Sequence, residues 1–175
     1  MTVLTAAGEG SAAYWIETGR PLTAWEQQMR LTRADVWLPI GDAVYRLALP
    51  YPQAVELERV AGYGIGAMWG KLPDEQSLSL KSRMPSDHAV HLVRLALIGG
   101  GVGVRNGAVF AVTPELARQI VEPMATGPLS AVWSLARATL AAVLFGREAT
   151  PDEQAAFSLP AGPPVPPAWA LEHRA

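Results

Sequence analysis

Residues Leu95–Gly107 read Leu-Ala-Leu-Ile-Gly-Gly-Gly-Val-Gly-Val-Arg-Asn-Gly, an apolar helix end followed by four glycines within five positions. Glycine at this density ends a helix and allows two stretches of backbone to approach closely. In the same stretch, Asn106-Gly107 accepts positive φ at both central positions of a two-residue turn. The sequence therefore predicts a helix that ends at Gly99, followed by a hairpin of residues 102–105 and 108–112.

Upstream of the glycines, residues 86–98 carry the pattern of an amphipathic helix. Ser86 is predicted to cap this helix, and Asp87 stands in the first turn, where the helix dipole favours an anion. Val93 and Leu97 share one stripe with further apolar side chains, which predicts a buried face.

Residues 36–49 predict a β-hairpin around a two-residue Gly41-Asp42 turn. Apolar side chains alternate on both sides of this turn, and its length places six of them on one face: Val36, Leu38, Ile40, Ala43, Tyr45 and Leu47. The opposite face shows Trp37, Pro39, Val44 and Arg46. Because Pro39 cannot donate a ladder hydrogen bond, the first strand is predicted to be a sheet edge. A lone hairpin is marginal in water, so its apolar face is expected to lie on helices.

Prolines, caps and apolar periodicity predict the remaining helices. The longer ones run from Tyr51 to Gly62, over Ile65–Leu72, from Pro114 through Met124 and over Leu129–Phe145. Short helices are expected over 24–31, behind a capping box that starts at Thr23, and from Thr150 to about Phe157. The predicted fold class is α+β, a mainly helical single domain with an N-terminal β-hairpin and a second short hairpin.

The chain of 175 residues divides into three predicted parts. Residues 1–34 form an N-terminal extension with a short helix, residues 35–147 form the core domain, and residues 148–175 form a short helix and a proline-rich tail. Five prolines fall within Pro160–Pro167. This composition predicts an extended, poorly packed tail that ends in Trp169.

Composition removes several classes of function. Half of the residues are hydrophobic and 17% are charged, where a soluble domain has about 25%, so a contact surface for partners is a reasonable hypothesis. The net charge is −2 without a Lys/Arg block, which argues against nucleic-acid binding. The absence of cysteine excludes disulfides, thiol catalysis and cysteine-ligated zinc.

No membrane association is expected from the sequence. Residues 1–13 lack a basic leader. The longest apolar tract, Leu129–Phe145, contains Arg137 and is too short for a membrane span, so it is interpreted as a buried amphipathic helix.

The candidate ligand sites all fail on detail, and no catalytic, metal or cofactor residues are predicted. The glycine run lacks the lysine of a phosphate loop and follows a helix instead of preceding one. His88 and His91 are spaced to face one metal, but a third ligand at a recognised spacing is missing, which favours a solvated polar face.

Six tryptophans are many for this length. Trp69 and Trp133 fall on apolar helical stripes and are predicted to be core residues. Trp37 lies opposite the six apolar hairpin residues and is either a core residue or an interface anchor.

Four places in the chain carry a family resemblance. They are the strand Ala43–Leu49 with Glu58 and Gly62-Tyr-Gly64-Ile65 after it, the Leu-Ile-Gly-Gly-Gly helix end, the helix Pro114–Val121, and the helix Leu129–Gly146. In this order, Val44–Gly146 resembles the small tail-protein family of gene transfer agents and related tailed phages. Residues 73–85 and 102–112 look expanded against the family, and both termini extend beyond it.

The resemblance implies a non-enzymatic role in phage-like tail morphogenesis, in the cytoplasm of a bacterium that carries a prophage-like element. Its members are described as tail tube proteins and likened to tail assembly chaperones, which hold tape-measure or tube subunits; entry into the particle and self-association stay open. Tube subunits are expected to be rich in β-strand, which favours the chaperone. The expected partner-binding residues are Trp37, Val44 and Arg46, with the edge strand available for β-augmentation. The alternatives are a structural tail tube subunit, a small helical DNA-binding regulator and a small hydrolase with a carboxylate site.

Overall fold

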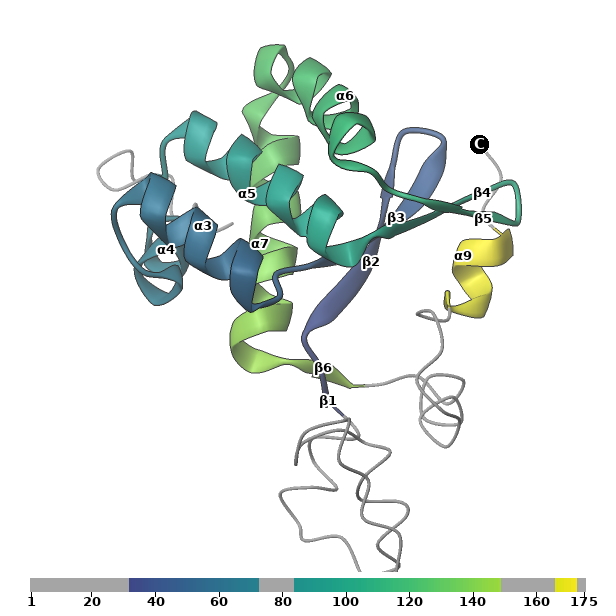
Figure 1. Cartoon of the computed structure of the whole chain (residues 1–175), viewed down its shortest axis with the longest axis horizontal. Coiled ribbons are helices and arrows are strands. Elements are labelled where there is room, and N and C mark those ends of the chain that lie inside the picture. Colours follow the sequence, from purple (N-terminus) through teal and green to yellow (C-terminus); the bar gives the residue numbers. More distant parts are fainter. Residues whose placement is uncertain (1–31, 73–83, 149–165, 173–175) are drawn as a thin grey trace, which may run out of the picture.

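The computed structural model describes residues 32–72, 84–148 and 166–172 (Figure 1). Its helices are α3 (Tyr51–Ala61), α4 (Ile65–Lys71), α5 (Ser86–Gly100), α6 (Pro114–Thr126), α7 (Leu129–Phe145) and α9 (Ala168–Glu172). Its strands are β1 (Thr32–Arg33), β2 (Asp35–Ile40), β3 (Ala43–Ala48), β4 (Val102–Arg105), β5 (Ala108–Ala111) and β6 (Arg147–Glu148). The fold is α+β and mainly helical, as predicted. The helices predicted over 24–31 and from Thr150 to about Phe157 lie outside the described residues.

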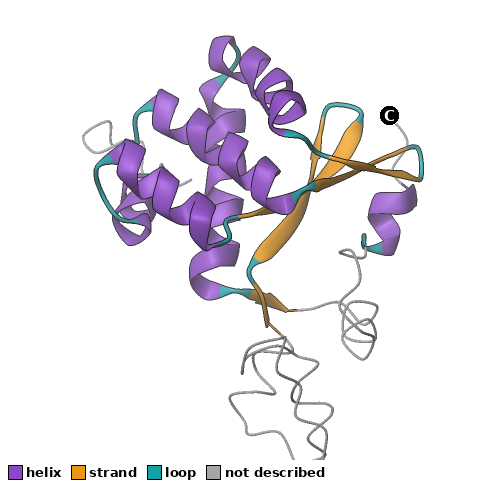
Figure 2. Ribbon diagram, in the orientation of Figure 1, coloured by secondary structure: helices purple, strands orange, loops and turns teal. Residues whose placement is uncertain are grey.

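The centre of the fold is a four-stranded antiparallel sheet in the order β2-β3-β4-β5, and β1 and β6 form a separate two-stranded ribbon. Figures 1 and 2 show the longer helices gathered on one side of the sheet and α9 on the other. We call the face toward the longer helices the inner face and the face toward α9 the outer face.

The first hairpin has the predicted register, with Ile40 opposite Ala43 and Val36 opposite Leu47. Gly41 takes a φ of 63° in the turn. All six predicted inner-face side chains belong to the main core or pack against it. The sheet order also confirms that β2, with its Pro39, is an edge strand.

The glycine run joins α5 to β3 through backbone contact. A Cβ added to Gly100 would lie 1.8 Å from the carbonyl oxygen of Arg46, and one added to Gly99 would lie 2.4 Å from that of Ala48. The helix extends to Gly100, one residue beyond the predicted end, and Gly101 closes it with a φ of 68°. Because these glycines are packed against β3, the structure gives them a packing role and not that of a phosphate loop.

The predicted hairpin after the glycines is confirmed as β4 and β5, with positive φ at Asn106 (51°) and Gly107 (77°). In the middle of β4, Gly103 stands between the rings of Tyr45 and Phe110, which meet edge to face at 5.8 Å. A Cβ on Gly103 would lie 2.5 Å from the Phe110 ring, so glycine makes this aromatic contact possible.

Helices α6 and α7 complete the inner layer. Thr113 caps α6 by accepting a hydrogen bond from the Leu116 amide at 3.2 Å, whereas Ser86 makes no capping bond and is instead the first residue of α5. The fully buried side chains of the core include Leu92, Val93 and Leu97 from α5, with Ala117, Ala136 and Leu140 from α6 and α7. Within the described ranges, no helix has the length and apolar character to cross a membrane.

The close approach of α5 to β3 predicts a strong asymmetry between glycines. Gly100→Ala adds a methyl group that overlaps the carbonyl oxygen of Arg46. The substitution should lower the free energy of unfolding by about 3 kcal/mol or more. Gly66→Ala in α4 meets nothing within 4 Å and should be neutral or stabilising by up to about 1 kcal/mol. Urea unfolding of both variants tests this, and equal effects would contradict the packing role of Gly100.

Candidate protein-binding surface

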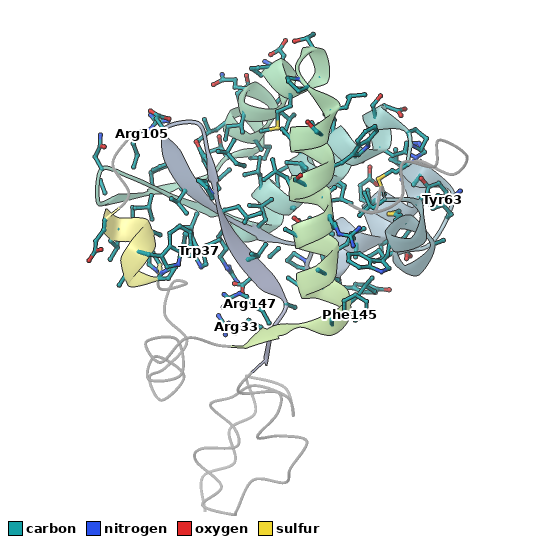
Figure 3. The ribbon with its side chains drawn as sticks, turned by 180° about the vertical axis from the view of Figure 1, so that it is seen from behind. Arg33, Trp37, Tyr63, Arg105, Phe145 and Arg147 are labelled. Atoms are coloured by element: carbon teal, nitrogen blue, oxygen red, sulfur yellow. The ribbon has the colours of Figure 1, made fainter. Side chains whose placement is uncertain are left out.

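The outer face of the sheet carries a second, smaller hydrophobic core. Strand alternation and the register bring Trp37 of β2, Val44 of β3 and Val104 of β4 to this face. Their side chains are 5%, 0% and 1% exposed and form one cluster with Ala170 of α9. Figure 3 shows Trp37 between the sheet and α9. Where β2, β3 and β4 meet, the sheet is therefore buried on both faces.

The cover on the outer face is the short helix α9. Its Ala170 is fully buried, and Pro167 in front of it is buried as well. Trp169 and Leu171 on its other side are 46% and 40% exposed. A helix of this length has no independent stability in water. We conclude that α9 is held in place by its contact with the sheet.

The expectation that Trp37 and Val44 form a free surface is wrong, because the chain's own α9 covers both of them. Of the two alternatives for Trp37, the structure supports the core residue. The prediction of a poorly packed tail is also wrong for residues 166–172. A five-residue helix is too short to produce a detectable apolar period, so the sequence did not indicate it.

Arg46, the third predicted binding residue, is held in a buried ion cluster around Asp35. The Asp35 side chain is 4% exposed and accepts from Arg46 Nε and, at 3.0 Å, from an Arg147 terminal nitrogen. Arg33 Nε lies 3.7 Å from the same carboxylate. Arg46 also donates to the Gly100 carbonyl oxygen at 3.3 Å. Since a buried carboxylate needs such partners, Arg46 serves the fold and is not a free cation for a partner.

This cluster fastens both ends of the core domain together. Arg33 pairs with Arg147 in the β1–β6 ribbon, and Figure 3 shows the two side chains beside each other. The predicted limits of the core domain, between residues 34 and 35 and between residues 147 and 148, therefore lie at the β1–β6 ribbon and the Asp35 cluster. A hollow of about 270 Å³ lies next to it, lined by Arg33, Ala34, Asp35, Arg46, Ala48, Leu49 and Pro50. The carboxylate that lines this hollow, that of Asp35, is already engaged by arginines.

The two histidines of α5 have protein partners. The Tyr63 hydroxyl and His88 Nδ1 are 3.0 Å apart, and Arg94 lies 3.2 Å from His91 Nδ1. Both histidines are half-buried, so the interpretation as a solvated polar face is only partly correct. No cluster of three metal-ligating side chains occurs in residues 32–72, 84–148 and 166–172. Burial, followed by the charge of Arg94, lowers the pKa of His91.

The two tryptophans predicted to be core residues are partly buried against the main core. Trp69 meets Phe145 edge to face at 5.2 Å, with the Arg137 guanidinium 4.9 Å from its ring centre. Phe145 itself is 67% exposed. These residues therefore form the margin of the core on the α4–α7 side.

Comparison of the chain with protein families, with curated proteins and with solved structures found no match.

Sequence reasoning missed the outer-face core and the Asp35 cluster. A signal for the first was present in β3, which reads Ala-Val-Tyr-Arg-Leu-Ala and has apolar side chains on both faces. Strands buried on both faces read in this way. The Asp35 cluster joins residues 112 positions apart, and no local pattern connects such positions.

The docking of α9 predicts that Ala170→Asp detaches it, because the substitution buries an unpaired carboxylate. We expect a loss of about 1–3 kcal/mol in the free energy of unfolding and faster hydrogen exchange at the Trp37 indole N–H. Ala168→Asp, at an exposed position of the same helix, is the control and should change stability by less than about 0.5 kcal/mol. An unchanged rate of hydrogen exchange at the Trp37 indole N–H in Ala170→Asp would show that α9 does not cover this face.

The lowered pKa of His91 predicts a stability loss on acidification. The unfolded chain binds a proton near the ordinary pKa of about 6.5, while the folded chain resists it. Stability should therefore fall as the pH drops below about 6.5. Urea unfolding at pH 7.5 and 5.5 should show a smaller drop for His91→Gln than for the native chain. Equal drops would mean that His91 titrates normally in the folded state.

Proposed function

We propose that this chain is a non-enzymatic protein of phage-type tail morphogenesis, and specifically a tail assembly chaperone that holds tube or tape-measure subunits. The resemblance of Val44–Gly146 to the tail-protein family is the starting point. The structural role of the Leu-Ile-Gly-Gly-Gly segment supports it, because the glycines in that segment pack α5 against β3. The need for glycine where α5 contacts β3 is a physical reason for the Leu-Ile-Gly-Gly-Gly motif on which part of the resemblance rests.

The observation that carries the proposal is an apolar sheet face with a small cover. Trp37, Val44 and Val104 require cover from water, and α9 supplies it through one fully buried alanine and a buried proline. Residues 149–167 separate α9 from β6, a chain length that reaches at most about 65 Å. A client segment with a small side chain at its centre would bind the same face in place of α9.

The fold supports a chaperone over a tube wall subunit. Four strands form the main sheet, and helices occupy its inner face. A tube wall subunit is expected to pair strands repeatedly around a ring, whereas a chaperone needs one binding face. The DNA-binding regulator gains no support from the charge, since the chain has a net charge of −2.

Capture of a purified tape-measure or tube subunit tests the proposal. A chain that ends at Val165 lacks α9 and should capture the client several-fold more strongly than the full chain, because a competing segment is gone. An excess of a peptide with the sequence of residues 160–175 should reduce capture by the truncated chain.

Two further measurements keep this test decisive. Trp37→Asp in the truncated chain should abolish capture, while Val60→Asp, at a position 41% exposed on α3, should leave capture unchanged. If neither truncation, peptide nor Trp37→Asp alters capture, the outer face is not the client site. Absence of capture in every variant, or binding to duplex DNA that weakens with salt, would overturn the proposed function itself.

A further inference from the structure

The strand β5 ends the sheet with an open edge. It packs extensively only against β4 among the described elements. Ala108, Val109 and Ala111 are exposed, with Val109 at 55%. Figure 2 shows the β4–β5 hairpin projecting beyond the helical layer. This edge is therefore accessible to another strand.

The register determines which backbone groups of β5 face outward. Arg105 and Ala108 flank the two-residue turn and face each other, as do Gly103 and Phe110. In an antiparallel ladder every second pair exchanges its hydrogen bonds, and the Val112 amide donates to Gly101 on the same inward side. The N–H and C=O groups of Val109 and Ala111 consequently point away from β4.

The two edges of the sheet are protected differently. The outward-facing groups of β2 belong to alternate residues that include Pro39, which has no N–H to offer. On β5 the corresponding positions are Val109 and Ala111, and residues 106–114 contain no charged side chain. Charge, proline and bulges are the usual devices that prevent edge pairing. The four residues of β5 have none of these, so only the shortness of the strand limits pairing and its outward groups stay open to another strand.

The outward groups of β5 are complementary to themselves. If two copies meet antiparallel with Phe110 opposite Phe110, then Val109 of each copy stands opposite Ala111 of the other. Both of these pairs exchange their backbone hydrogen bonds, and a two-fold axis passes between the phenylalanines. No other residue of the strand needs to change its present hydrogen bonds.

We propose that β5 pairs with β5 of a second copy of this chain, which joins the two main sheets into one continuous antiparallel sheet. The side chains agree with this pairing. Val109 and Ala111 extend the apolar outer face beyond Val104, while the Phe110 rings meet at the centre of the inner side, where close pairs favour aromatic contact. The two-fold symmetry favours a second copy over an unrelated strand. This inference does not depend on the proposed function.

Cysteine cross-linking tests the pairing directly, because the chain has no native cysteine. Val109 and Ala111 of opposite copies should have Cα atoms about 5.5 Å apart, within the range of a disulfide. Two Val109 residues, or two Ala111 residues, should be diagonal neighbours at about 7–8 Å, beyond that range. A mixture of Val109→Cys and Ala111→Cys chains should therefore form a disulfide-linked dimer under mild oxidation, at least several-fold more than either chain alone.

Sedimentation of the full chain supplies the second measurement. The native chain should show a concentration-dependent dimer, and Ala111→Pro should weaken it at least tenfold, since the lost N–H points outward and leaves β4 pairing intact. Val60→Cys mixed with Ala111→Cys is the matched control and should not cross-link. A native chain that stays monomeric, a dimer unaffected by Ala111→Pro, or cross-linking that is equal in the single variants would overturn the proposal. Pairing of β5 with a different protein's strand would overturn the choice of a second copy.

Discussion

The structure depends on the contact between two glycines and a strand. Gly99 and Gly100 bring the end of α5 so close to β3 that no side chain fits between the two backbones. This contact fixes the position of α5 on the inner face, and Gly101 then turns the chain directly into β4. Helices α6 and α7 pack against α5, so the whole inner layer takes its place from this approach.

The second constraint acts on the outer face, where the beginning and the end of the core domain meet. Asp35 binds arginines from β3 and β6 and so links the beginning of the core domain to its end. Further along the same face, α9 covers the side chains that would otherwise lie in water. Charge pairing closes one part of this face and apolar packing closes the other. The ion cluster lies within the predicted core domain, whereas α9 follows that domain in the chain after residues 149–167.

This arrangement supports the proposal of a protein-binding role. The buried carboxylate of Asp35 is consumed by the fold, and the histidines of α5 have partners among neighbouring side chains. Two features of the described residues enter the proposals: an apolar sheet face covered by a small helix, and a strand edge without charged side chains. Both are features through which a polypeptide recognises another polypeptide by shape, apolar contact and backbone hydrogen bonds.

The sequence by itself determined the fold class, the two hairpins with their two-residue turns and the close packing of the glycine run. These follow from local rules, because turn length, side-chain alternation and backbone freedom act within a few residues. The state of Trp37, Val44 and Arg46 was decided only by the tertiary structure. Trp37 and Val44 are buried by α9, more than a hundred positions away in the sequence, and Arg46 is held by the cluster around Asp35. Local sequence patterns do not predict burial that depends on such distant contacts.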